Sequence, residues 1–420
     1  MEQATAETST ARSSVASEDP SICYVAEGKL YLKRPGADAA TLIESTFAQE
    51  LIDRAQRGRD RNGWRQQGMM WNFGSGGRGI LPPGMPDGPP AEVRRVRFTG
   101  ISPGGAGAAE IYYALDTDHV GGLFQYDLRE GYERRLYHAH EFRAHHLSRH
   151  PTSGQLAMSV REPDGTAHVA LADANGRKLR KVTEGDVVDE CPSWIVGENA
   201  LVYQSAGVGR SEQGFRMGLG PYVVHRLDLD DGSMRTLAED ESYDFLLPRV
   251  DERDGALWFI RRPYQPHGPP VSPWKVFLDV VLFPYRLVRA IVHFLDFFSR
   301  VFSRQPLMTA GGPPREGPDQ RTLMLWGKVI DAEKEMAKSH RDGDGSLVPD
   351  SWQLVRRAKD GSDAVVARGV VAYDLCPGDG SVVYTNGNSV VRIGANGSSD
   401  PIVRGRLIES VRVLPTTPAR

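Results

Sequence analysis

The feature that most constrains this chain is a pattern of four short strands that recurs at intervals of roughly forty residues. Its clearest copy spans residues 187–237, where β-branched and aromatic runs alternate with turns rich in Gly, Asp and Asn. Such alternation is typical of an antiparallel meander. Because one four-stranded sheet cannot bury its own faces, repetition at this interval predicts sheets that stack as blades.

The other copies of this unit span, in chain order, residues 93–136, 145–182, 245–367 and 370–403. The copy over residues 245–367 is interrupted, because its first two strands precede residue 265 and its outer two follow residue 350. The interruption predicts an insertion between two strands of one sheet.

The two ends of the chain supply the strands of one further unit. Three strands over residues 22–43 lack a fourth, and one strand over residues 407–414 lacks a sheet. Pairing them would close a ring and leave no open sheet edge. The sequence therefore predicts an all-β, six-bladed β-propeller of four-stranded antiparallel blades over residues 21–414, closed by its N- and C-terminal strands. A seventh blade stays open if residues 63–95 contain strands.

The residues of the repeat also carry a resemblance. Pro192-Ser193-Trp194, a polar turn and Ala200-Leu201-Val202-Tyr203 together resemble the repeat of TolB-type propellers. Degenerate copies of the same turn are found at residues 101–105, 148–154 and 376–380. The resemblance implies a six-bladed scaffold used mostly for binding. TolB itself is secreted and has an extra N-terminal domain, and neither feature is expected here, so a periplasmic role is not implied.

Composition excludes several classes of function. The formal net charge of −3 does not indicate a nucleic-acid partner. The three isolated cysteines argue against a disulfide framework and against a paired-cysteine zinc site. Residues 1–20 are rich in Ser, Thr, Ala and Glu without an apolar core, so we expect a disordered tail and no secretory signal. A second short tail is expected over residues 415–420, and the expected location is the cytoplasm.

The insertion at residues 265–350 contains an amphipathic pattern over residues 274–304. Placed on a helix, its charged residues form a narrow basic strip beside a wide aromatic face, with Pro284 expected to kink or split the helix. This pattern favours peripheral contact with an anionic membrane at its inner face, while packing on the propeller, on another helix or on a second copy of the chain stays open. The residues expected to contact the membrane or a partner are Trp274, Phe277, Phe283, Arg286, Arg289, Phe294, Phe297, Phe298, Arg300 and Phe302.

A second insertion, residues 46–91, is predicted to contain a short helix over residues 48–56 that continues into an Arg-rich stretch and a Gly/Pro-rich loop. The arginines fit either a solvated basic face or contact with anionic lipid.

A histidine cluster is the main candidate for chemistry. The candidates for metal ligands are His138, His140, His145 and His146. Adjacent residues of a strand point to opposite faces, so only part of the set is expected to converge, and His145 or His146 could line the central channel. Histidines satisfied at a blade junction are the preferred interpretation, so no cofactor is expected.

The sequence therefore favours a non-catalytic TolB-like scaffold that binds a protein or small ligand at one face and is associated with a membrane through the inserted helix. Two alternatives stay open. One is a metal-dependent lyase or hydrolase with a histidine site at the channel, and the other is a soluble scaffold whose insertion helix mediates self-association.

Overall fold

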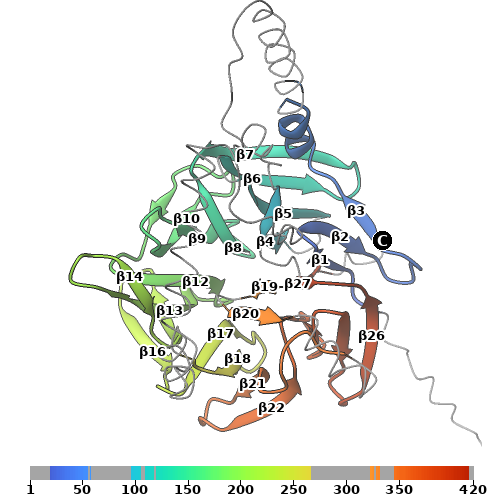
Figure 1. Ribbon diagram of the computed structural model, residues 1–420. Helices are drawn as coiled ribbons and strands as arrows, with labels where there is room; N and C mark the ends of the chain where they lie inside the picture. Colours follow the sequence, from blue (N-terminus) through green and yellow to red (C-terminus); the bar gives the residue numbers. More distant parts are fainter. Residues whose placement is uncertain are drawn as a thin grey trace, which may run out of the picture.

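The computed structural model describes residues 19–54, 57, 96–105, 109–117, 120–265, 322–325, 328–331 and 345–415. These residues are mostly β-strands, which form antiparallel sheets arranged around a common centre (Figure 1). This arrangement is that of a β-propeller.

Three of the sheets contain four antiparallel strands whose order in the sheet is their order along the chain. The first consists of β4 (Arg97–Pro103), β5 (Glu110–Asp116), β6 (Val120–Asp127) and β7 (Tyr132–His140). The second consists of β17 (Tyr243–Val250), β18 (Leu257–Pro263), β21 (Gln353–Arg357) and β22 (Asp363–Arg368). The third consists of β23 (Ala372–Leu375), β24 (Val382–Thr385), β25 (Ser389–Ile393) and β26 (Ser399–Arg404).

A nine-stranded sheet contains two successive runs of strands that meet at one parallel pair, Ala167 with Val188. The first run is β8 (Arg143–Arg149), β9 (Leu156–Arg161), β10 (Ala167–Ala172) and β11 (Arg180–Lys181). The second run is β12 (Val187–Trp194), β13 (Ala200–Arg210), β15 (Val223–Asp228) and β16 (Met234–Ala238), with β14 (Arg216–Leu219) paired to the far end of β13.

The predicted closure of the two chain ends is confirmed. β27 (Ile408–Val413) pairs with β1 (Ile22–Ala26), and β2 (Lys29–Lys33) and β3 (Thr41–Ile43) complete that sheet. In the antiparallel register Ile22 lies opposite Val413. The first and last strands therefore satisfy each other's backbone groups, which a linear array of sheets would leave exposed.

Six strands surround the centre, one from the inner end of each run of paired strands. They are β4, β8, β12, β17, β23 and β27. Successive members contact each other from β4 through β17 and from β23 through β27 back to β4. The remaining junction, between β17 and β23, is made by the Tyr373 hydroxyl, which donates to the Leu247 carbonyl over 2.7 Å.

The hydrophobic core lies between neighbouring sheets. For example, the stacked rings of Tyr113 and Phe124 have centroids 5.5 Å apart and pack with Leu30 and Leu32 of the closing sheet. Burial of each such side chain contributes about 1.5–3 kcal/mol, so the ring depends on contact between sheets as well as on pairing within them.

Several of the central strands are bulged at the same place. His146, Cys191 and Leu247 have positive φ angles of 53°, 57° and 54°, and the pairing register shifts at each. Bulges of this kind change the direction of side chains, so neighbouring residues of the strand no longer point strictly to opposite faces of the sheet.

The structure corrects several predicted boundaries. β14 and the hairpin of β19 (Thr322–Leu325) with β20 (Lys328–Asp331) were not predicted. The helix in the first insertion begins at residue 46, two residues before the predicted start, and residues 55 and 56 at its predicted end lie outside the described residues. The predicted helix over residues 274–304 lies outside the described residues. Of the helical segments that are described, none has the length and apolar character needed to cross a membrane.

Candidate functional site

One position in each central strand lies at the same level of the ring. The side chains at this position, called here the ring residues, are Ser102, Ser148, Ser193, Arg249, Asp374 and Arg412. Two residues after each of them, a backbone N–H donates to a carbonyl at or just before the start of the neighbouring strand in the same sheet; the donors are Gly104, His150, Ile195, Asp251, Cys376 and Leu414. In five cases this bond closes a hairpin, and in the sixth Leu414 donates to Ser21 across the closure of the two chain ends. The shared bond makes the ring residues structurally equivalent, although their chemistry differs.

Two of the ring residues, Ser102 and Asp374, bridge neighbouring strands through the same kind of hydrogen bond. The Ser102 Oγ accepts a hydrogen bond of 2.9 Å from the backbone N–H of Arg149, which follows the next ring residue. Asp374 repeats this geometry, since its Oδ2 accepts 2.8 Å from the backbone N–H of Val413. These bonds place the side chains between central strands, where they hold adjacent sheets together.

The charged half of the ring has the order Arg249, Asp374, Arg412. Arg249 Nη1 lies 3.1 Å from Asp374 Oδ1, and their side chains are 18% and 8% exposed. Arg412 donates from Nε to the carbonyl of Ile101 over 3.0 Å. Burial, with the nearby charge of Arg249, lowers the pKa of Arg412 to about 10, so this guanidinium is still charged at neutral pH.

A second ion pair lies close to this part of the ring. Glu190 on β12 accepts two hydrogen bonds from Arg161, of 2.7 Å from Nη2 and 3.2 Å from Nε. The Tyr222 hydroxyl donates to its other oxygen over 3.4 Å. Burial of Glu190 opposes its ionisation, but Arg161 and His146 outweigh burial and hold the pKa of the carboxyl below its ordinary value.

The four histidine candidates are divided between the rim and the centre. His138 and His140 are exposed on β7, the last strand of its sheet, whereas His145 and His146 are on the central strand β8. Burial lowers the pKa of His146 to about 4, and burial likewise holds the pKa of His145 well below its usual range. Within the described ranges, no three His, Cys, Asp or Glu side chains are grouped so that they could hold a metal ion.

The expected alternation of His145 and His146 is modified by the bulge. Their ring centroids lie 5.9 Å apart, because the positive φ of His146 turns its side chain away from the regular position.

None of the residues predicted to contact a membrane or partner, Trp274 to Phe302, falls within the described residues. A different surface is visible instead on β13 and β14. β13 extends beyond its sheet and pairs with β14 through Val208–Leu219 and Gly209–Gly218, forming a hairpin at the rim of the ring (Figure 1). We call residues 207–219 the arm.

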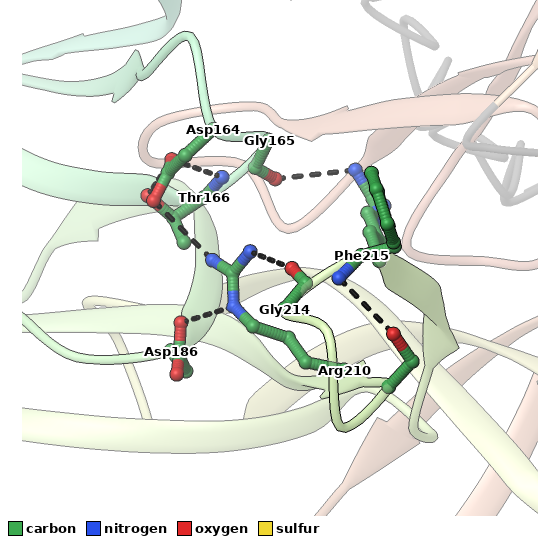
Figure 2. Close-up of polar contacts among 9 residues, drawn as sticks. Asp164, Gly165, Thr166, Asp186, Arg210, Gly214 and Phe215 are labelled. Carbon is green, nitrogen blue, oxygen red and sulfur yellow. Dashed lines mark hydrogen bonds and ion pairs between the residues drawn. The ribbon is translucent and has the colours of Figure 1, made fainter.

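Arg210 fixes the arm to the body of the propeller. Its Nε lies 2.7 Å from Asp186 Oδ1, and its Nη2 lies 3.3 Å from Asp164 Oδ2 (Figure 2). Its Nη1 donates to the carbonyl of Gly214 at the arm's own turn over 3.3 Å. A single guanidinium thus links the turn of the arm to two segments of the sheet below it.

Two large apolar side chains are exposed on the arm. Phe215 is 72% exposed and Met217 is 69% exposed. Between them, Arg216 donates to the carbonyl of Gly165 over 3.1 Å, while the backbone of Phe215 is bonded to Ser211 (Figure 2). The backbone of the arm is therefore held in place, and its apolar side chains remain in solvent.

A small cavity lies away from both of these regions. It has a volume of about 210 Å³ and is lined by Ser346, Asp350, Arg368, Tyr384, Asn386, Val391, Ser399 and Pro401. The Ser346 Oγ lies within hydrogen-bond distance of the carbonyls of Val348 and Gly369, so its one hydrogen is already satisfied, which indicates a structural role for this side chain.

Sequence reasoning missed the ring residues and the arm. The spacing Ser148-x-x-Pro151, Asp374-x-x-Pro377 and Arg412-x-x-Pro415 would have aligned three ring residues before the blade turns. The arm had a weaker signal, an Arg and two apolar residues in a Gly-rich connection.

Comparison with known proteins gives a limited result. No protein-family model matches the chain, and no curated protein matches it. Among solved structures, TolB from Acinetobacter baumannii is similar at 10% identity and a TM-score of 0.47, covering 93% of this chain and 66% of that chain. A nidogen/laminin complex has 9% identity, a TM-score of 0.47, and coverage of 94% and 97%. A putative TolB from Agrobacterium tumefaciens has 12% identity, a TM-score of 0.39, and coverage of 77% and 92%.

Proposed function

We propose that this protein is a six-bladed, TolB-like β-propeller that acts as a non-catalytic binding protein and holds a protein partner on the arm. The blade count is supported by the six equivalent backbone hydrogen bonds that follow the ring residues, five in hairpins and one across the closure of the chain ends. The observation that carries the binding proposal is the pair of exposed apolar side chains, Phe215 and Met217, on a hairpin whose backbone is fixed.

Such a hairpin is suited to binding for two reasons. Removing a Phe or Met side chain from water contributes about 1.5–3 kcal/mol, and aromatic anchors often dominate interface energy. Because Arg210 and Arg216 already hold the arm, little further ordering of its backbone is needed on binding.

The arm can be tested by capture of a partner with purified full-length protein on beads, followed by a binding constant measured with the purified partner. We expect the double variant F215S/M217S to bind at least tenfold more weakly than wild type. Y132S is a matched control, since Tyr132 is 62% exposed on a different strand, β7. Equal affinity of the wild type and the double variant would reject the arm as the binding surface.

We further propose that segment 274–304 associates the propeller with the inner face of a membrane. The support is its sequence pattern, a basic strip beside a wide aromatic face. Co-sedimentation with liposomes of mixed neutral and anionic lipid should retain the full chain and lose a variant without residues 270–312. If both forms or neither form sediment, the membrane proposal is wrong. Light scattering of the same pair would detect self-association through this segment.

A further inference from the structure

The centre of the ring contains more positive than negative side chains at the level of the ring residues. Arg249 and Arg412 face one carboxylate, Asp374. That carboxylate is fully engaged, because it pairs with Arg249 and accepts from the backbone N–H groups of Leu375 and Val413. Within the described ranges, one guanidinium is therefore left without an anionic partner.

Arg412 is that guanidinium. Its Nε is used by the Ile101 carbonyl, whereas its two Nη groups form no hydrogen bond or ion pair with any of the residues that the structure describes. The charged or titratable groups around it are Arg249, Asp374, Cys191, Tyr373 and His146. The next acidic group, Glu190, is already held by Arg161 and Tyr222.

Other ring residues besides Arg412 also have hydrogen-bond donors that are not used. The Nε of Arg249 is buried and has no hydrogen-bond partner among the residues that the structure describes. At the same level, the hydroxyls of Ser148 and Ser193 make no hydrogen bond within the described part of the chain. Arg412 and Ser148 are only partly buried, so the centre is accessible to solvent.

A partly buried charge without an anionic partner among the described residues is unfavourable, and an anion supplied from solution would offset that cost. A guanidinium has two parallel N–H groups that match the oxygens of a carboxylate or phosphate. We propose that a small anion with a carboxylate or phosphate group binds at the centre of the ring, on the Nη groups of Arg412 beside Arg249. This site is separate from the arm and does not depend on the protein partner.

The test is titration of the full-length protein with sodium phosphate, sodium acetate or sodium chloride at matched ionic strength, followed by thermal unfolding and by calorimetry. We expect saturable binding of phosphate, acetate or both, with a rise in Tm that chloride does not produce. Saturation by phosphate alone assigns a phosphate site, and saturation by acetate assigns a carboxylate site. No saturable binding of either anion overturns the proposal.

Variants locate the site. R412Q is expected to weaken binding at least tenfold, and the matched control R235Q, which removes an exposed arginine on β16, is expected to bind as wild type does. If R412Q does not fold, R412K preserves the charge but removes the paired N–H groups, and at least a threefold weakening is expected. Unchanged affinity in a folded Arg412 variant would place the anion elsewhere and overturn the assignment. Because neither variant alters Phe215 or Met217, failure here leaves the arm proposal standing.

Discussion

The centre of the ring and the arm use charge in opposite ways. At the centre, Arg249, Asp374 and Arg412 are buried or partly buried, and the single carboxylate, Asp374, cannot neutralise both guanidiniums. On the arm, Arg210 lies between two carboxylates that are 55% and 64% exposed, so its charge is more than matched. The comparison indicates that the centre has one more guanidinium than carboxylate among the ring residues. On the arm, ion pairs fix the backbone, and the side chains presented to solvent are apolar.

The largest expected effect comes from removing the one carboxylate of the ring. D374N leaves the partly buried guanidiniums of Arg249 and Arg412 without the carboxylate between them, which should lower the free energy of unfolding by about 3–5 kcal/mol. Urea unfolding at pH 7 measures this change. A loss below about 1 kcal/mol would mean that water already neutralises the centre, and the contrast with the arm would fail.

A smaller loss in the free energy of unfolding is expected when the pH is lowered. Since the folded-state pKa of His146 is about 4 and its ordinary value is 6.5, the unfolded state takes up a proton first as the pH falls. The corresponding stability is fully present above pH 6.5 and is lost as the pH falls from there toward about 4. Unfolding measured from pH 7.5 to pH 4.5 should show this slope, and H146Q should reduce it. An unchanged slope in H146Q would assign the dependence to other groups, such as His145.

The salt bridges of the arm should contribute little to global stability, because pairs with exposed carboxylates are weak. R210A is expected to change Tm by no more than about 2 °C. Its effect should be local, with amide hydrogen exchange at residues 211–216 becoming at least tenfold faster. R235Q serves as the control. If exchange in the arm is unaltered, Arg210 does not hold the hairpin.

The smallest effect is expected from the apolar side chains of the arm. F215S removes a ring that is largely in water, so the free energy of unfolding should stay within about 0.5 kcal/mol of wild type. Measurement by urea unfolding separates a binding role from a structural one. A large loss of stability would show that Phe215 packs in solution.

The strands and their closure could be predicted from the sequence because they depend on hydrophobic pattern and turn residues. β1 to β3 and β27 were placed correctly, since Ile22 to Ile43 and Ile408 to Val413 have strand patterns without local partners. The outer pair β21 and β22 was also recognised as belonging with β18 across the insertion.

The two candidate regions could not be predicted for different reasons. Ring residues are equivalent in position but differ in chemistry, so Ser102 and Arg412 do not resemble each other as a motif. The arm lies in a Gly-rich stretch, 205–220, which has the composition of a loop. Only part of the histidine cluster was expected to converge, and its members do fall on an outer strand, β7, and a central strand, β8, a separation that depends on tertiary structure.

The pairing of β1 with β27 has a mechanical consequence. Ile22 and Val413 lie opposite each other at one end of the strand pair. A force that pulls the two termini apart would therefore separate β1 from β27 one residue pair at a time, starting at that end. Arg412 is opposite Cys23, only one step inside that end. An anion bound to Arg412 and Arg249 would connect the last strand to a sheet formed much earlier in the chain, and would resist the start of that opening.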